Sequence, residues 1–542
     1  MPLRSTGCAT CRKRKIRCDE GRPGCKRCAT HGVPCPGYRG EKAGGIEFED
    51  QTSITVKRAS AIQQKLSTSR RSPGKLSPGS SGMSVSQYTN GSRLFTQTGG
   101  YFMLWPMAAY SQESGLGGGS IPTPVRSPSV ERTQLYDKFV EGYVPQGPGK
   151  RSLHFDYIRL LVDAQETHQS LKDGLDALSL VHVGSQLKDQ RLVQQAIKAY
   201  SRSLIGLGRA IEEGQALTND SVLAAATVLS VCEFYDEIKL NGLGWMGHQN
   251  GLGQLLAARG PDSLKTDLAL MLFFNARHGA LAQGLITRKL PLFAQANWRA
   301  CAFRIPVPDH STTFYDLAIQ IPGMLERHDL IDLASPTALQ SLTELLADCG
   351  RLEFDFRNWE IGWQTRFRVE QRKPYWLQKI EDFELLPQLV PDRKFNEGYM
   401  FHQFLEAYMF NQYWQCMHFL RECVESLQLQ RQLLDPTWLP DPGTEVTFEE
   451  LNEYVLHLCR SLPYMCEPET SISGHVAIFL PIRVAAFHFK KHNMWEWLRW
   501  IWAVRATIFN RGVSQPNVGD AQTIAAGQIR HVQNVQEMRT RP

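Results

Sequence analysis

Six cysteines lie close together near the start of this 542-residue chain, and their spacing is regular. Adding 17 to the number of each of the first three gives the second three, so the pattern CxxCxxxxxxC occurs twice. Two residues between thiols let both sulfurs bind one zinc ion, and the six-residue excursion is long enough for a short helical turn to bring back a third. The predicted metal ligands are Cys8, Cys11, Cys18, Cys25, Cys28 and Cys35.

The number of thiols limits how zinc can bind. Two separate zinc ions, each with four ligands, need eight ligand positions, whereas this segment holds six sulfurs. We therefore expect two sulfurs to bridge both metals, so that the cofactor is a cluster of two zinc ions per chain. A disulfide knot or a zinc store would also gather cysteines. The missing secretory signal disfavours a disulfide knot, and a zinc store would not need a duplicated spacing or a run of cations on one side.

That run of cations lies between the second and third cysteines. Residues 1–40 hold ten Lys and Arg against two acidic residues, a net charge of +8, whereas the whole chain has +6. The equivalent stretch of the second half, ATHGVP at 29–34, has no Lys or Arg. Zinc binding therefore does not need the charge, which predicts contact with a polyanion. The cations predicted to make this contact are Arg12, Lys13, Arg14, Lys15 and Arg17.

Composition divides the chain into three predicted regions: 1–40, 41–130 and 131–542. The middle region is rich in Ser, Gly and Pro, and we expect a disordered, flexible linker because such sequences bury too little apolar surface to fold. Its apolar stretch YFMLWPMAAY at 101–110 either docks on the folded body or binds a partner.

Helical periodicity dominates the third region. The clearest helix runs from Asp189, a predicted N-cap, to Gly214, a predicted C-cap, and its apolar stripe is expected to pack within its own domain rather than in a coiled coil. The stripe consists of Val193, Ile197, Tyr200, Leu204, Leu207 and Ile211. Because alternating β patterns are scarce, we predict an all-α body, with further helices at 220–236, 246–258, 263–288, 393–430, 448–461 (capped by Thr447) and 493–510.

Three further patterns in the body resemble functional sites but are better explained without one. GLGWMG at 242–247 matches a dinucleotide-binding motif but follows a predicted helix, not a strand. His488 and His492 lie one turn apart without a third metal ligand, and core packing explains the tryptophans at 495, 497, 500 and 502. No catalytic residue is predicted, and the chain is expected not to be an enzyme.

The lack of a secretory or membrane-spanning segment predicts a protein inside the cell. The N-terminus has no apolar run that could act as a secretory signal, so the thiols are expected to stay reduced. The most apolar stretches are too short to cross a bilayer, and no membrane partner is expected.

Residues 8–35 resemble the fungal binuclear zinc cluster (Zn(2)-C6 type) of transcription regulators, in all six cysteines, the basic loop and Pro23. The resemblance implies two short helices around a two-zinc thiolate cluster. It implies that Cys8 and Cys25 bridge the zincs, that Cys11 and Cys18 complete one site, and that Cys28 and Cys35 complete the other. It also implies that Lys15, with Arg14 beside it, reads CGG-type triplets in double-stranded DNA while Arg12, Lys13 and Arg17 contact phosphates.

The body carries a second resemblance. VCEFYDE at 231–237 and GWMGHQNGLGQLLAARGP at 244–261 resemble the fungal-specific transcription factor domain of the second type, an all-α regulatory module. Together the two resemblances imply a nuclear regulator of RNA polymerase II genes that recruits co-regulators and controls a metabolic or secondary-metabolite gene cluster. No coiled coil is evident between 40 and 70, so the sequence does not decide between a monomer and a homodimer. The alternatives are a zinc-dependent RNA-binding or metal-storage protein, or an enzyme with a helical small-molecule domain.

Overall fold

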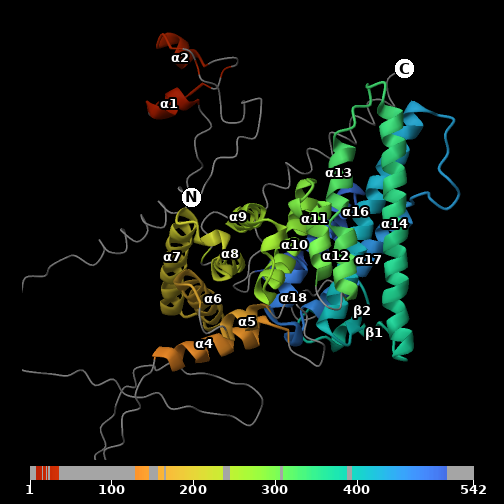
Figure 1. The fold of residues 1–542 in the computed structure, drawn as a ribbon. Coiled ribbons are helices and arrows are strands. Elements are labelled where there is room, and N and C mark those ends of the chain that lie inside the picture. The colour runs from red at the N-terminus through yellow and green to blue at the C-terminus, as the bar shows by residue number, and fades with distance from the viewer. Residues whose placement is uncertain are drawn as a thin grey trace, which may run out of the picture. The chain divides into compact units, whose positions relative to one another are not determined.

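The computed structural model describes two compact units of the chain (Figure 1). Residues 1–55 belong to the first unit, here called the head, and residues 56–542 to the second, called the body. The predicted linker at 41–130, with its apolar stretch 101–110, falls outside the described residues up to position 127. The described residues are 8–14, 16, 18–19, 21, 25–33, 35, 128–145, 157–163, 167–235, 238, 244–304, 309–386 and 394–509.

The head contains two short helices that repeat the duplication seen in the sequence. Helix α1 spans Ala9–Lys13 and helix α2 spans Lys26–Thr30, so both ends of the second helix lie 17 residues after those of the first. The buried core of the described head consists of cysteine side chains alone, with Cys18 and Cys35 packed against it. A core of this kind offers little apolar surface, so the fold of the head depends on what the thiols bind.

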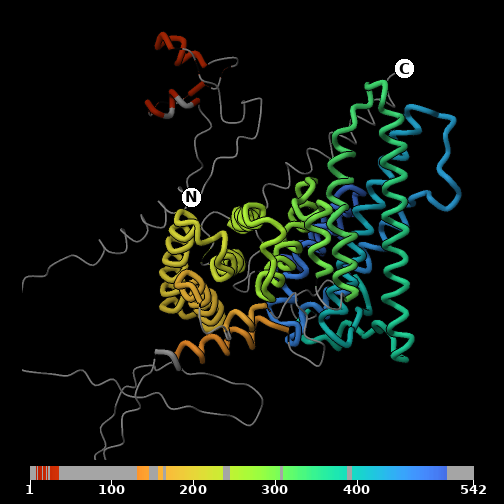
Figure 2. The backbone as a smooth tube through the Cα atoms, in the orientation of Figure 1, coloured from red at the N-terminus to blue at the C-terminus, as the bar shows by residue number. Residues whose placement is uncertain are grey.

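The body is mainly helical, as predicted. In its first part α6 and α7 lie side by side and α8 packs against both (Figure 2). The helices of this part are α4 (Pro128–Tyr143), α5 (Tyr157–Asp163), α6 (Gln169–Leu187), α7 (Gln190–Glu212), α8 (Asp220–Cys232), α9 (Gly244–Arg259) and α10 (Asp267–Thr287). Short 3-10 turns η1 (Gln215–Leu217) and η2 (Pro261–Ser263) follow α7 and α9.

The second part of the body is organised around two long helices, α14 and α16, which pack against each other. Its helices are α11 (Ala296–Cys301), α12 (His310–Ala318), α13 (Ile321–Asp329), α14 (Ala338–Val369), α16 (Phe404–Leu434), α17 (Phe448–Met465), α18 (Ser471–Ala477), α19 (Phe479–Lys491) and α20 (Trp495–Phe509). Single 3-10 turns also occur at η3 (Leu292–Ala294), η4 (Ala302–Arg304), η5 (Ile380–Asp382) and η6 (Pro468–Thr470).

Local capping explains where several predicted helices begin and end. The Asp189 carboxylate accepts a hydrogen bond from the backbone N–H of Arg191 at the start of α7 (2.8 Å), and Gly214 follows its end with φ of +74°. The Thr447 hydroxyl accepts from the N–H of Glu450 (3.2 Å) at the start of α17. These contacts satisfy backbone groups that a helix leaves unpaired, which confirms both predicted N-caps.

The predicted stripe of α7 is largely buried within the body, as expected. Val193, Tyr200, Leu204 and Leu207 are buried in the main core cluster. Ile197 is half-buried, and Ile211, near the end of the helix, is 43% exposed. Most side chains of the stripe therefore pack in the core of the body.

One small sheet departs from the all-α prediction. Strand β1 (Tyr375–Lys379) pairs antiparallel with strand β2 (Glu397–Phe401), with Trp376 opposite Met400. The predicted helix at 393–430 is therefore wrong over its first residues, and α16 begins only at Phe404. At Gly398 a side chain would meet Pro463 Cγ at 2.9 Å, so the strand fits tightly against α17.

Among the described residues, no single helix is long and apolar enough to cross a membrane. A pair at 468–477 and 479–491, bent by 55°, passes that test by length and composition alone. Its side chains Phe479, Ile482 and Phe489 are buried in the core of the body, which is the ordinary place for an apolar helix in a folded domain.

Candidate metal centre and nucleic-acid interface

The six thiols of the head converge on one small volume. The sulfur of Cys8 lies 3.7 Å from that of Cys25 and 3.6 Å from that of Cys28, and the sulfurs of Cys11 and Cys25 are also 3.7 Å apart. Four of the cysteines are fully or almost fully buried, while Cys18 and Cys35 are half-buried. Residues up to 27 positions apart in the sequence thus form one cluster of sulfur atoms.

The sulfurs form two groups of four. Within each group all the sulfur atoms lie within 4.8 Å of one another. Two cysteines, Cys8 and Cys25, belong to both groups, and they hold the same position in the two halves of the repeat. The groups are Cys8, Cys11, Cys18 and Cys25, and Cys8, Cys25, Cys28 and Cys35.

The distances between the sulfurs suit zinc. A tetrahedral ion with Zn–S bonds of 2.3 Å separates its sulfurs by about 3.8 Å, close to the 3.6–3.7 Å found between these thiols. Four thiol ligands are also a common donor set for structural zinc. The residues present therefore fit zinc, which would supply the positive charge that buried thiolates need and would join the two halves of the head.

Backbone N–H groups point at the two shared sulfurs. The N–H of Cys11 donates to Cys8 Sγ (3.4 Å), and in the second half the N–H of Cys28 donates to Cys25 Sγ (3.3 Å). Such donors favour a negatively charged sulfur. Burial acts in the opposite direction, since it raises the pKa of the Cys11 thiol to about 12 and also raises the pKa of Cys25 and Cys28. Thiolates at this place therefore require a cationic partner.

Sequence reasoning missed an acidic residue that orders the head. Asp19 directly follows the third cysteine, and its carboxylate accepts hydrogen bonds from the backbone N–H groups of Lys26 (3.0 Å) and Arg27 (3.4 Å). These donors lower the pKa of Asp19, the contact with Lys26 having the largest effect. Asp19 thus caps the first turn of α2 and ties the end of the first half to the second. Asp19 lies seven residues before α2, outside the spacing of a local cap, so no sequence signal pointed to this contact.

The structure describes part of the predicted basic interface. Lys13 and Arg14 are exposed at the C-terminal end of α1, and the backbone N–H of Arg14 donates to the carbonyl of Thr10 (3.1 Å). Arg12 lies on the same helix, but its side chain is outside the described part. Lys15 and Arg17 also lie outside the described residues. On the second helix, Lys26 and Arg27 are exposed cations that were not among the predicted contacts.

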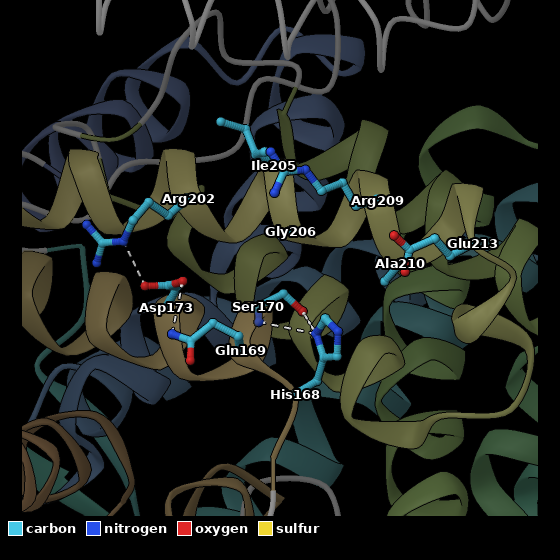
Figure 3. A pocket seen from close by; sticks show the side chains of 10 residues that line it. All are labelled: His168, Gln169, Ser170, Asp173, Arg202, Ile205, Gly206, Arg209, Ala210 and Glu213. Carbon is cyan, nitrogen blue, oxygen red and sulfur yellow. Dashed lines mark hydrogen bonds and ion pairs between the residues drawn. The ribbon is translucent and has the colours of Figure 1, made fainter.

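The body has a surface pocket of about 470 Å³ between the N-terminus of α6 and one face of α7 (Figure 3). Its wall includes an ion pair between Arg202 Nε and Asp173 Oδ1 (2.8 Å). His168 Nδ1 accepts from the N–H of Ser170 (3.2 Å) and lies 2.7 Å from the Ser170 hydroxyl. Because Ser170 is 1% exposed, this contact caps α6 rather than presenting a reactive hydroxyl to solvent.

Of the histidine pair predicted to be packed or solvated and not a metal site, His488 lies in the interior and His492 is half-buried. His488 is buried, its Nδ1 lies 3.2 Å from Nε2 of His418, and its ring stacks on Phe448. Burial lowers the pKa of His488 to about 2, so its ring is neutral. The groups of metal-ligating atoms found in the described residues are those of the head cysteines.

Two more patterns from the sequence can be compared with the structure, the glycine-rich motif and the four tryptophans. Residues 244–259 of the glycine-rich segment form helix α9, while positions 242 and 243 lie outside the described residues. Trp500 is buried and Trp497 packs against the core, as predicted. Trp495 and Trp502 are 55% and 50% exposed, so the expectation of core packing is wrong for these two. They lie on the opposite face of α20 from the core.

Comparison with known families assigns both units. Residues 6–43 match the model of the fungal Zn(2)-Cys(6) binuclear cluster domain, and residues 134–386 match that of a fungal specific transcription factor domain. The first match covers all six thiols. The second runs from α4 to the residues just after η5. No solved structure matches the chain.

Curated relatives match parts of the chain. An uncharacterised protein of Emericella nidulans is 25% identical over 184 residues, which is 32% of this chain and 39% of the relative. The Zn(2)-C6 fungal-type transcription factor afumD of Aspergillus fumigatus is 49% identical over 41 residues, 8% of this chain and 11% of its own. The aspercryptin biosynthesis cluster-specific transcription regulator atnN of Emericella nidulans is 56% identical over 32 residues, 6% and 5% of the two chains.

In each of these comparisons the chain covers well under two thirds of the relative. The two family models nevertheless match separate units, and the six-thiol geometry agrees with the first of them. The chain therefore belongs to the fungal Zn(2)-C6 binuclear cluster transcription factors and carries their fungal-specific regulatory domain.

Proposed function

We propose that this transcription regulator acts in the nucleus by binding specific sequences in double-stranded DNA near genes transcribed by RNA polymerase II. The head provides DNA binding, and the helical body regulates and recruits co-regulators. Support comes from the two matched families and from the placement of exposed cations next to the thiol cluster.

The cofactor is a cluster of two zinc ions. One ion is held by Cys8, Cys11, Cys18 and Cys25, and the other by Cys8, Cys25, Cys28 and Cys35. The proposal is supported by the two groups of four sulfurs that share two members. Bridging by the shared thiols gives each ion four ligands from six cysteines, and the two halves of the head then cannot separate without losing metal.

Recognition is assigned to the end of α1. Lys15 and Arg14 donate to guanine O6 and N7 of CGG-type triplets in the major groove, while Arg12, Lys13 and Arg17 neutralise phosphates. The internal repeat supports this division of roles. The positions 17 residues after Lys13, Arg14 and Lys15 are Thr30, His31 and Gly32, so the second half keeps the metal spacing without the cations.

The single observation that carries the proposal is the pair of sulfur groups next to an exposed cationic helix end. Selection of bound sequences from a random pool of double-stranded DNA with the zinc-loaded full chain tests it. We expect enrichment of CGG-type triplets, and loss of enrichment when a chelator is present. Equal recovery of all sequences, or stronger retention of single-stranded RNA in a parallel pool, would contradict it.

The target genes are a further part of the proposal. Control of a secondary-metabolite gene cluster is supported by the printed role of one relative, a regulator specific to the aspercryptin biosynthesis cluster. That similarity covers 32 residues of the head, so it bears more on the mode of DNA binding than on the pathway. Genome-wide occupancy of the tagged protein would show the targets, and the spacing of half-sites would show whether a homodimer binds.

A further inference from the structure

Helix α20 carries two exposed tryptophans on the face that points away from the core. Trp495 and Trp502 are 55% and 50% exposed, and they lie seven residues, or about two helical turns, apart. The opposite face of the helix holds Leu498, Ile501 and Val504, which are buried in the core of the body. Large apolar side chains that group together on the surface of a folded domain commonly mark a place that another molecule covers.

An arginine lies between the two tryptophans on the same face. Arg499 is exposed, four residues after Trp495 and three before Trp502, so the three side chains are neighbours on the helix surface. We call Trp495, Arg499 and Trp502 the Trp–Arg ridge. Tryptophan and arginine are among the residue types that contribute most to binding between proteins. The composition of the ridge is therefore that of a contact surface.

The positive charge at the ridge has no acidic partner. Among the described residues, neither Arg499 nor Arg505, also on α20, nor Arg483, on α19, forms a hydrogen bond or an ion pair. Burial and the charge of Arg505 lower the pKa of Arg483, so these two cations repel each other. The acid of this helix, Glu496, already lies 3.5 Å from Lys394 through its Oε2. Three unmatched cations beside two indoles favour a negatively charged partner.

The spacing of the tryptophans indicates the form of this partner. A helix that lies along α20 presents apolar side chains at the same seven-residue interval, with others three or four residues between them. Carboxylates at the edges of that apolar face can then meet the arginines. Residues 510–542, which follow α20 in the sequence, hold four Arg against two acidic residues and so do not supply the missing negative charge.

We propose that the Trp–Arg ridge, together with Arg483 and Arg505, is a docking surface for an acidic amphipathic helix of a protein partner. The two indoles pack against the apolar face of that helix, and the three arginines contact carboxylates at its edges. This inference deepens the proposed recruitment of co-regulators by the body and rests on it. Because the ridge takes no part in DNA or zinc binding, the docking surface can fail while DNA binding by the head holds.

Binding of two synthetic peptides to the zinc-loaded full chain tests the proposal. Both are stapled as helices and carry one apolar face of leucines, but the flanking positions are Glu in the first peptide and Lys in the second. Fluorescence anisotropy of the labelled peptides measures their affinities. We expect the acidic peptide to bind at least about 10-fold more tightly and its binding to weaken as salt rises. Absence of binding by the acidic peptide, or equal affinities of the two, would overturn the proposal.

Variants of the ridge show where the acidic peptide binds, since the head is cationic as well. Trp502→Ala and Arg499→Glu should each weaken binding by about 10-fold. The matched controls Leu377→Ala on β1 and Arg351→Glu on α14 change exposed residues elsewhere on the body and should leave it unchanged. If the ridge variants, with the helical content of the parent protein, bound the peptide as the parent does, the peptide would lie elsewhere and the proposal would be wrong.

Other occupants of the ridge would give different results. Vesicles of phosphatidylserine and phosphatidylcholine that bind the parent protein more tightly than Trp502→Ala, with no binding of the acidic peptide, would assign the ridge to a membrane surface. A molecular mass of two chains that Trp502→Ala reduces to one would assign it to a second copy. Binding of CGG-containing DNA by the same samples is the reference. Peptide binding that fails while DNA binding persists would reject the docking surface and leave the DNA-binding function in place.

Discussion

The carboxylate of Asp19 accepts a hydrogen bond from the backbone N–H of Lys26, at 3.0 Å, across the two halves of the head. Its second oxygen accepts from the next N–H, of Arg27. Asp19 lies directly after one thiol of the first half and Lys26 directly after one thiol of the second. The contact is made by protein groups alone, and it holds the two sets of cysteine ligands at a fixed distance from each other.

Removal of this contact should weaken the metal site. We expect Asp19→Ala to lower zinc affinity by about 10-fold, because residues that orient metal ligands commonly affect affinity on that scale. Asp19→Asn retains an oxygen acceptor and should lose less. Competition with a coloured chelator measures both. Zinc affinity equal to that of the parent protein in Asp19→Ala would show that the carboxylate does not position the ligands.

The cations at and just after the end of α1 should have two different roles in DNA binding, base recognition and phosphate contact. Lys15→Ala should cost about 1–3 kcal/mol on a CGG-containing site and relax its specificity. Lys13→Ala should weaken all sequences alike and reduce the salt dependence of binding by about one unit. Fluorescence anisotropy at several salt concentrations distinguishes the two effects.

The internal repeat supplies a control for these variants. His31 is exposed and occupies the position 17 residues after Arg14. We expect His31→Ala to change neither affinity nor specificity. If it weakened binding as much as Arg14→Ala, the second half of the head would contact DNA too and the proposed division of roles would be wrong.

Removal of zinc should unfold the head and leave the body intact. The described core of the head is made of cysteines, so without a metal little remains to hold it together. The body forms its own compact unit with a large apolar core. We expect a chelator to abolish DNA binding while the main thermal transition, followed by far-ultraviolet circular dichroism, stays in place. A large downward shift of that transition would show that body stability depends on metal.

Loss of a buried ion-pair network in the body should lower the free energy of unfolding. Arg421 of α16 has a 3% exposed side chain and hydrogen bonds to carboxylate oxygens of Glu353, on α14 (2.8 Å), and of Glu450, on α17 (2.8 and 2.9 Å). Arg421→Ala leaves two acids without their buried partner and should cost about 3–5 kcal/mol of unfolding free energy. Urea denaturation followed by fluorescence measures the loss.

Arg351, on α14, provides the matched control. It also pairs with a carboxylate, that of Asp348, but its side chain is 71% exposed. Solvent screens such a pair, and Arg351→Ala should cost less than about 1 kcal/mol. Equal losses for Arg351→Ala and Arg421→Ala would mean that burial does not set the strength of these contacts.

Much of the fold follows from local sequence signals. The caps at Asp189 and Thr447 and the apolar period of α7 depend on residues within a few turns of one another, so they can be read from a short window. Helix α14 lies outside the predicted helices, although its buried residues show the same 3- and 4-residue spacing. They are Leu342, Leu345, Cys349, Leu352, Phe356, Trp359, Trp363 and Phe367.

Other features depend on partners distant in sequence. Residues 397–401 carry aromatic and apolar side chains that suit either a helix or a strand, and pairing with residues 375–379 decides for a strand. The thiols of the head could be predicted because the repeat is local. The contact of Asp19 with α2 could not, since spacing alone does not show which segments meet.

The zinc content of the full chain is the most direct test of the account. Native mass spectrometry of the protein should give two zinc ions per chain. Cys8→Ser, which removes a thiol shared by both sulfur groups, should lower the affinity for both ions, whereas Cys35→Ser should affect one. One zinc or none in the parent protein, or two ions that respond alike to both variants, would contradict a bridged two-zinc cluster.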